Sequence, residues 1–222
     1  MKKSSHKRVL VVAATALEIT PFLEQLNKGL LLNKLWETDV LITGIGLTAT
    51  TYSLVKQIQT RKPDLIIQAG VGGCFDANRS LGEVVVVKQE AIADQSVIEL
   101  NQLKTLFDLK LVPQDQFPYQ KGWLVNQSPI LKKIKYKKVR GISVNEITTD
   151  PKKRKFYEIT FDPVVESMEG AALHYVALRE QIEFLQIRSF SNYIAERNKK
   201  KWEMRTSIMH LNEALIRTIH QL

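Results

Sequence analysis

Cysteine is nearly absent from this sequence, since its 222 residues include only Cys74. A single cysteine excludes a disulfide framework within the chain and is typical of a reducing compartment. Long apolar runs are missing as well, because no stretch of about 18 apolar residues exists that could form a transmembrane helix. The apolar run at residues 9–14 is too short for the central region of a signal peptide. We therefore expect a cytoplasmic protein that does not bind membranes.

Acidic residues are fewer than basic ones. The chain has 32 Lys and Arg residues against 23 Asp and Glu, which gives a formal net charge of +9. The excess lies in short runs at residues 132–138, 152–155 and 199–201. No zinc spacing, RNA-binding aromatic motif or long basic helix accompanies these runs, so we interpret them as solvated loops and helix faces. A basic nucleic-acid-binding protein is the alternative outside the enzymes.

Apolar, β-branched runs alternate with amphipathic segments along the chain. Near-continuous Val, Ile and Leu runs are typical of strands covered on both faces. The spacing of apolar residues predicts helices at 47–60, 169–181 and 203–222. This alternation predicts an α/β fold with a mostly parallel sheet, and the long run at 82–93 indicates a mixed, partly closed one. The predicted strands are 8–14, 39–44, 64–70, 82–93, 138–144, 163–168 and 184–190.

The composition fits one domain. With 44% hydrophobic and 25% charged residues, a chain of 222 residues is long enough for one core. We therefore expect a single domain over 1–222, with residues 1–7 as a flexible basic N-terminus. Prolines mark residues 101–135 and 149–162 as the regions richest in loops.

Two glycine-rich segments follow predicted strands. TGIGLTA at 43–49 opens a helix and matches a dinucleotide-binding pattern, but the acidic residue that should end the next strand is absent, since Asp64 begins it. QAGVGGCF at 68–75 ends that next strand. Glycines after a strand let the backbone approach a ligand, and helix N-termini offer free N–H groups. The glycines expected to contact a ligand at this edge are Gly46, Gly72 and Gly73.

Two glutamates follow strands at the same edge. Glu18 completes a capping box with Thr15, yet Pro21 favours a helix that starts near Thr20 and leaves Glu18 on a loop. Capping and catalysis both stay open for Glu18. Glu169 begins a helix, where an acidic residue stabilises the helix dipole by ~0.3–1 kcal/mol. Its functional interpretation is a carboxylate that accepts hydrogen bonds from a vicinal diol.

Five short motifs resemble the nucleoside phosphorylase/nucleosidase superfamily, and the resemblance extends from about Arg8 to the C-terminal helix. It implies a three-layer sandwich around a twisted, mixed, mostly parallel sheet, a homodimer or larger oligomer, and a small-molecule purine nucleoside as substrate. Within the superfamily, SNYIAERNKKKW at 191–202 makes the chain look most like the futalosine hydrolases of menaquinone biosynthesis. The motifs are ALE at 16–18, TGIG at 43–46, AGVGG at 69–73, SMEGAA at 167–172 and RSFSN at 188–192.

The resemblance also implies roles for individual residues. Glu18 matches the carboxylate that activates the attacking water in the methylthioadenosine/adenosylhomocysteine nucleosidases. Met168 and Glu169 match the pair that holds the ribose, with Glu169 on its 2′ and 3′ hydroxyls. Ser191 and Asn192 match a Ser-Asp pair whose aspartate contacts the purine N7.

Two residues are expected to contact the purine. Ile147 aligns loosely with a position that packs on the base in the resembling enzymes. Asn192 replaces the aspartate of those enzymes and cannot supply a proton. Its NH₂ can donate to O6 while its carbonyl accepts from a protonated N7, a pattern that suits a 6-oxopurine such as hypoxanthine and disfavours adenine. The source of the N7 proton is left open.

The attacking group is predicted to be water. A phosphorylase needs cationic and N–H donors around its anion. Neither ATALEITP at 14–21 nor AGVGGCF at 69–75 contains Lys or Arg, and a carboxylate in the first segment can take a proton from water. We predict hydrolysis with no metal or organic cofactor, and the four histidines share no metal-site spacing. An adenine-releasing nucleosidase and a purine nucleoside phosphorylase are the enzyme alternatives.

Overall fold

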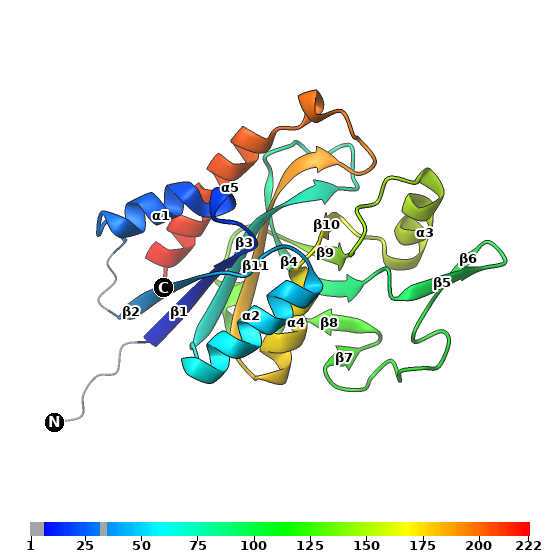
Figure 1. The fold of residues 1–222 in the computed structure, drawn as a ribbon, viewed down its shortest axis with the longest axis horizontal. Helices are drawn as coiled ribbons and strands as arrows, with labels where there is room; N and C mark the ends of the chain where they lie inside the picture. Colours follow the sequence, from blue (N-terminus) through cyan, green and yellow to red (C-terminus); the bar gives the residue numbers. More distant parts are fainter. Residues whose placement is uncertain (1–6, 32–34) are drawn as a thin grey trace.

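The computed structural model describes residues 7–31 and 35–222 (Figure 1). Residues 1–6 of the predicted flexible N-terminus lie outside the described residues, and Lys7 already belongs to the first strand. The predicted mixed α/β fold is confirmed. Its elements, in chain order, are β1 (Lys7–Ala13), η1 (Ala16–Ile19), α1 (Thr20–Asn27), β2 (Trp36–Ile42), α2 (Leu47–Thr60), β3 (Leu65–Cys74), β4 (Val84–Ile92), β5 (Ser96–Glu99), β6 (Gln102–Thr105), β7 (Tyr119–Gln120), β8 (Trp123–Val125), η2 (Pro129–Lys132), β9 (Lys137–Ser143), α3 (Pro151–Phe161), β10 (Val165–Ser167), α4 (Gly170–Arg179), β11 (Glu183–Tyr193), η3 (Lys199–Lys201) and α5 (Met204–His220).

Parallel and antiparallel strands share one sheet. β1 pairs in parallel with β2 and β3, and β3 pairs in parallel with β11. β10 runs antiparallel to β3 and parallel to β9, while β4 runs antiparallel to β11 and parallel to β9. The pairings therefore lead from β3 through β11, β4, β9 and β10 back to β3. Among the described strands, five of the nine pairings in this sheet are parallel, so the central sheet is mixed.

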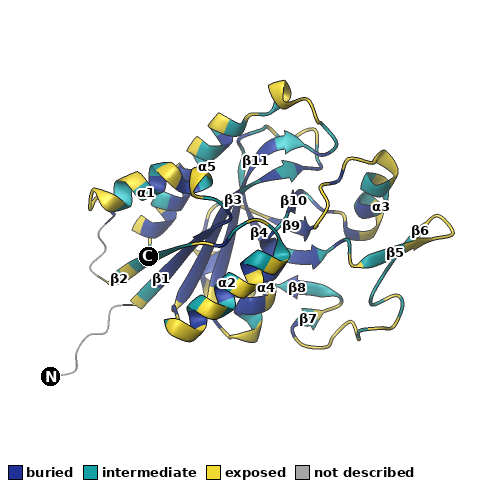
Figure 2. Cartoon of the chain, viewed as in Figure 1, coloured by how far each residue is buried: buried dark blue, intermediate teal, exposed yellow. Residues whose placement is uncertain are grey.

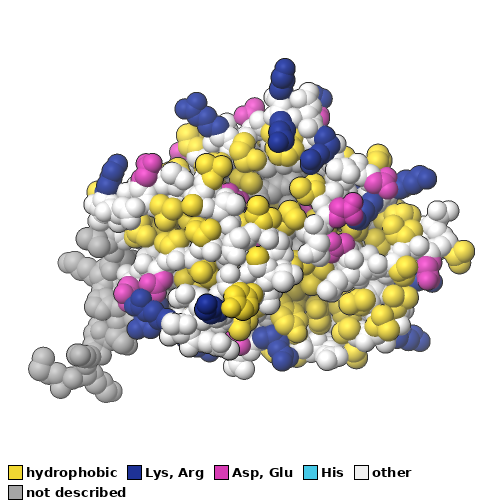
Figure 3. Space-filling model, viewed as in Figure 1, with side chains coloured by type: hydrophobic (Ala, Val, Ile, Leu, Met, Phe, Trp, Pro, Cys, Tyr) yellow, Lys and Arg dark blue, Asp and Glu magenta, His cyan; other side chains and the backbone are white. Residues whose placement is uncertain are grey.

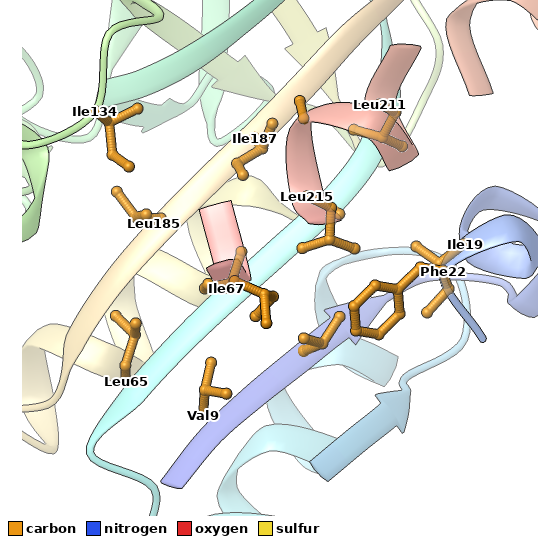
Figure 4. Packing of buried hydrophobic residues seen from close by; sticks show 14 of the residues in the cluster. Val9, Ile19, Phe22, Leu65, Ile67, Ile134, Leu185, Ile187, Leu211 and Leu215 are labelled. Atoms are coloured by element: carbon orange, nitrogen blue, oxygen red, sulfur yellow. The ribbon is translucent and has the colours of Figure 1, made fainter. Parts of the chain in front are cut away.

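Both faces of the sheet are covered where β1 and β3 run. Val9 and Val11 of β1 pack with residues of α1 and α5 (Figure 4). Leu10 and Val12 point to the other face and pack with residues of α2 and α4. Side chains alternate between faces along a strand, so a strand buried on both faces reads as one continuous apolar run. Figure 2 shows these buried strands between helices whose exposed residues face outward. The complete three-layer sandwich stays a prediction.

The expectation of a loop at 149–162 is wrong, because α3 fills most of this segment. Asp150 caps the helix by accepting a hydrogen bond from the backbone N–H of Lys152 at 2.9 Å. Tyr157 and Phe161, one turn apart, are both buried and anchor the helix to the sheet. The basic run at 152–155, between the cap and these two anchors, obscured the amphipathic pattern of this short helix in the sequence.

The other loop-rich region, 101–135, also holds more structure than expected. β6 pairs with β5 in one antiparallel hairpin, and β7 pairs with β8 in another. β8 then joins the main sheet by pairing with β4. These strands are too short to give a periodic pattern that the sequence would reveal.

The basic runs lie on separate elements. Residues 132–138 lead from η2 into β9, residues 152–155 belong to α3, and residues 199–201 form η3. On the face shown in Figure 3, Lys and Arg side chains are scattered singly or in small groups. This dispersed arrangement supports the interpretation of the runs as solvated surface.

Leu215 of α5 offers a test of the core. Its side chain is fully buried against the sheet, whereas Met209 on the same helix is 50% exposed. We expect Leu215→Ala to lower the free energy of unfolding by about 2–5 kcal/mol, because apolar burial is lost and a cavity is left. Met209→Ala, as the matched control, should change it by no more than about 0.5 kcal/mol. Urea unfolding followed by circular dichroism measures both, and equal losses would contradict this packing.

Candidate active site

A cavity of about 300 Å³ opens where β1, β3, β10 and β11 end. Eight of the nine predicted site residues line this cavity. The ninth, Gly46, lies outside the lining but donates its backbone N–H to Glu169 Oε1 at 3.2 Å. The fold thus brings together residues that are far apart in the sequence. The eight are Glu18, Gly72, Gly73, Ile147, Met168, Glu169, Ser191 and Asn192.

Glu18 both caps a helical turn and faces the cavity. It lies in η1, and α1 begins at Thr20, as the proline pattern predicts. Its Oε2 accepts hydrogen bonds from the backbone N–H and the hydroxyl of Thr15, each at 3.1 Å. Its Oε1 accepts from the backbone N–H of Val71 at 3.0 Å. The capping box therefore holds the carboxylate in place at the cavity wall, so capping and a chemical role are compatible.

Glu169 forms a buried ion pair that the sequence analysis missed. It occupies the N-cap position of α4 and is 6% exposed. Its Oε2 lies 3.5 Å from both terminal nitrogens of Arg188, a residue of β11 that is 1% exposed. The same guanidinium donates to Gln68 Oε1 at 2.9 Å and to the Val71 carbonyl at 3.3 Å. An arginine inside an otherwise apolar strand was the signal available in the sequence, because such a charge needs a buried partner.

Gly70 makes room for this arrangement. A Cβ at this position would lie 2.3 Å from Arg188 Nη1 and 3.1 Å from Glu18 Oε1. Any side chain would therefore push the guanidinium and the Glu18 carboxylate apart. The glycine-rich end of β3 is thus needed for packing between charged groups as well as for an approach to a ligand.

Ser191 and Asn192 end β11 with a defined orientation. The Ser191 hydroxyl donates to Asn192 Oδ1 at 2.9 Å, and Asn192 Nδ2 donates to the Tyr193 carbonyl at 3.1 Å. These two contacts fix which side of the amide carries the oxygen. Because the NH₂ has a second hydrogen and the oxygen a second lone pair, each can still bind one group of a ligand.

A carboxyl group that the sequence analysis missed also lines the cavity. Glu166 of β10 is 5% exposed, and its Oε1 accepts from the backbone N–H of Thr148 at 3.1 Å. Burial raises the pKa of this carboxyl group above its ordinary value. An acidic residue within the apolar segment PVVES was the only sign of it in the sequence.

Helix α4 begins against a buried polar layer. The hydroxyl oxygens of Ser167 and Ser143 accept the N–H groups of Gly170 and Ala171 at 3.2 and 2.8 Å. Ser143 also donates to Glu90, whose pKa burial raises to about 8. A Cβ on Gly170 would lie 2.6 Å from Glu90 Oε2, so only glycine lets α4 approach the sheet this closely.

Residues 195–202 close one side of the cavity. The indole N–H of Trp202 donates to the Glu196 carbonyl at 3.0 Å, and the Arg197 guanidinium lies 5.8 Å from the indole ring centre. Lys201 pairs with the Glu196 carboxylate at 2.8 Å, which lowers the pKa of that carboxyl group. This wall is the more exposed end of the cavity, and Arg197 is the only Lys or Arg among the described residues that line it.

No group of three or more His, Cys, Asp and Glu side chains is placed to hold a metal ion in residues 7–31 and 35–222. Within the same ranges, no helix has the length and apolar character needed to cross a membrane.

Several known proteins are similar to this chain. A 5′-methylthioadenosine/S-adenosylhomocysteine nucleosidase from Maridesulfovibrio salexigens is 26% identical over 179 residues, which cover 72% of this chain and 70% of that protein. One similar solved structure is an aspartate-to-asparagine mutant of the Helicobacter pylori nucleosidase with 5′-methylthioadenosine in its active site. It superimposes on this chain with a TM-score of 0.78 and 18% sequence identity, over 97% of this chain and 99% of that one. Futalosine hydrolase from Helicobacter pylori has a TM-score of 0.78, 18% identity and coverage of 97% and 98%. The two structures share the fold of this chain.

The family assignment rests on nearly the whole sequence. The profile of the phosphorylase superfamily matches residues 8–220, from the first strand to the last helix. This range includes every residue that lines the cavity. The chain therefore belongs to the phosphorylase superfamily.

Proposed function

We propose that this protein is a purine nucleosidase that hydrolyses the N-glycosidic bond of futalosine, releases hypoxanthine and so acts in menaquinone biosynthesis. The observation that carries the proposal is the convergence of Glu18, Glu169 and Asn192 on one cavity. Each of the three has the chemistry needed for a different part of the reaction: the water, the ribose and the base.

Glu169 is proposed to bind the ribose. Its Oε1 accepts from the Gly46 N–H and keeps a lone pair for a further donor, while Oε2 accepts both terminal nitrogens of Arg188 at 3.5 Å, contacts long enough for a closer donor to share that oxygen. The 2′ and 3′ hydroxyls of a ribose are two such donors on neighbouring carbons. Because the carboxylate is already fixed by a buried ion pair, it holds the sugar without having to be ordered by it.

Glu18 is proposed to activate the water. As the bond between C1′ and the purine breaks, the base leaves with the bonding electrons and the sugar becomes oxocarbenium-like. Water then attacks C1′, and the Glu18 carboxylate accepts the proton that the water loses. The N–H of Val71 and the capping contacts with Thr15 hold this carboxylate at the cavity wall.

Asn192 is proposed to recognise the leaving base. Its NH₂ donates to O6 of a 6-oxopurine, and its carbonyl accepts from the protonated N7. The Tyr193 carbonyl can only accept, so the amide cannot turn over to suit a 6-amino group without losing its NH₂ contact to that carbonyl. This contact favours hypoxanthine over adenine as the leaving base.

Water is preferred over phosphate as the attacking group. The guanidinium of Arg188 is buried near Glu18, and its terminal nitrogens already bind Glu169, Gln68 and the Val71 carbonyl. Among the residues that the structure describes, no further cation stands beside the Glu18 carboxylate to receive a phosphate at this wall. Arg197 lines the cavity only at its exposed end.

A 5′-methylthioadenosine/S-adenosylhomocysteine nucleosidase is the second candidate. The Maridesulfovibrio salexigens relative carries that name and is more similar in sequence than the futalosine hydrolase structure. That candidate releases adenine, which the fixed orientation of the Asn192 amide disfavours. Base preference therefore separates the two candidates.

The first prediction concerns the reaction and the Glu18 carboxylate. The purified protein should release hypoxanthine from futalosine in phosphate-free buffer, and phosphate should not accelerate the release. Glu18→Gln should lower kcat by about 10²–10⁴-fold, because the amide cannot take a proton from water. Glu24→Gln changes an exposed glutamate of α1 and serves as the control. Chromatographic detection of hypoxanthine decides the outcome, and release only after phosphate is added would identify a phosphorylase instead.

The second prediction concerns Asn192. Asn192→Asp should shift the ratio of kcat/KM values toward 6-amino substrates, because an aspartic acid can donate a proton to N7 and no longer donates to O6. The measurement compares futalosine with its 6-amino analogue, and methylthioadenosine with methylthioinosine, in wild type and variant. If wild type already prefers the 6-amino member of both pairs, Asn192 does not select the base.

A further inference from the structure

Glu166 and Asn192 lie in one row across three strands. Gly73 of β3 pairs with Glu166 of β10 on one side and with Asn192 of β11 on the other. Paired residues on neighbouring strands direct their side chains to the same face of a sheet. All three residues line the cavity, so the row faces the site.

Gly73 leaves the middle of this row empty. A Cβ there would lie 2.5 Å from Ile194 Cδ1 and 3.5 Å from Asn192 Nδ2, so a side chain has no room. Neighbouring strands are about 4.8 Å apart, which places the two flanking backbones about 10 Å from each other. The backbone of Gly73 therefore forms a flat surface between the side chains of Glu166 and Asn192, and a planar base fits on such a surface.

The Glu166 carboxyl group has unused hydrogen-bonding capacity. Its Oε1 is bound by the Thr148 N–H, but its buried Oε2 forms no hydrogen bond of normal geometry among the described residues, although the Thr148 hydroxyl, itself without such a partner there, acts on this carboxyl group. A buried acceptor left unpaired costs about 1–3 kcal/mol. A ligand that brings an N–H to this carboxyl group would remove that cost.

We propose that Glu166 accepts a hydrogen bond from N1–H of a 6-oxopurine and, together with Asn192, selects the base. This inference rests on the proposed nucleosidase function. A 6-oxopurine has a donor at N1, which matches a carboxylate, whereas adenine has an acceptor there, which a carboxylate repels. Asn192 binds the O6 and N7 edge of the same base, so the two side chains bind different edges of one ring.

The protonation of Glu166 links this choice to pH. Burial raises the pKa of Glu166, and the charge of Asp94 raises it further. Hydrogen bonding from Thr148 and the charge of Lys153 on α3 lower it. The charge of Glu166 in turn contributes to the raised pKa of Tyr157 on α3, together with burial and Asp94. Below its pKa the neutral acid can donate to N1 of adenine, and above it only an N1–H is matched. The preference for 6-oxopurines should therefore rise with pH.

Glu166→Gln tests the assignment. The Thr148 N–H requires an acceptor and so keeps the amide oxygen of the glutamine on its side, which leaves the NH₂ to face the base. We expect the ratio of kcat/KM for futalosine to that for its 6-amino analogue to fall by about 10- to 100-fold. The rise of this ratio with pH should disappear in the variant. Titration of Glu18 affects both substrates alike and cancels in the ratio.

The controls separate this role from a structural one. Glu213→Gln removes an exposed carboxylate of α5 that lies outside the cavity lining, and it should leave the ratio unchanged. Glu166→Asp keeps the charge and should retain the 6-oxopurine preference while lowering kcat/KM for both substrates. The pH dependence of the wild-type ratio needs no variant at all.

The outcomes distinguish this inference from the proposed function. The inference fails if wild type cleaves both nucleosides but the ratio of their kcat/KM values is independent of pH and unchanged in Glu166→Gln. In that case Glu166 does not bind N1. If wild type releases no base from either nucleoside, the proposed function itself fails.

Discussion

The buried guanidinium of Arg188 is the constraint on which the site depends. A charge inside a protein is tolerated only when it is paired and hydrogen-bonded. Here Glu169 supplies the opposite charge, Gln68 and the Val71 carbonyl supply further acceptors, and Gly70 supplies the space. Removing one partner would leave an uncompensated charge in the core. The carboxylate proposed to hold the ribose is therefore part of the scaffold itself, which explains how it stays in position without a ligand.

Much of the fold could be predicted because both faces of the sheet are covered. A strand such as β1, buried on both faces, gives a continuous apolar run, and α2 begins and ends at the predicted residues 47 and 60. β3 continues beyond its predicted end at residue 70, because its glycine-rich end keeps pairing with β11. α3 escaped prediction because Tyr157 and Phe161 alone anchor it. Short hairpins such as β7–β8 depend on pairing with distant strands, which no local pattern reports.

The candidate site was predictable where a polar residue follows an apolar strand. Glu18, Glu169 and Asn192 all stand at such points, and the chain brings them to one cavity. Arg188 and Glu166 lie within segments that read as strands, where a charged residue was the only sequence signal, and the structure shows that both are buried. The register that sets β10 and β11 on either side of β3 comes from tertiary pairing, and a sequence read locally does not contain it.

Base selection at this site depends on side chains whose donor and acceptor atoms are already oriented by the protein before a ligand binds. The Tyr193 carbonyl fixes the NH₂ side of the Asn192 amide, and the Thr148 N–H fixes one oxygen of the Glu166 carboxyl group. Groups held in this way do not have to reorganise as charge develops on the leaving base, which is the condition for electrostatic stabilisation. The sugar is held separately, by the ion pair between Arg188 and Glu169. A change at position 166 or 192 can therefore alter which base is accepted while the ribose site and the sheet beneath it stay intact.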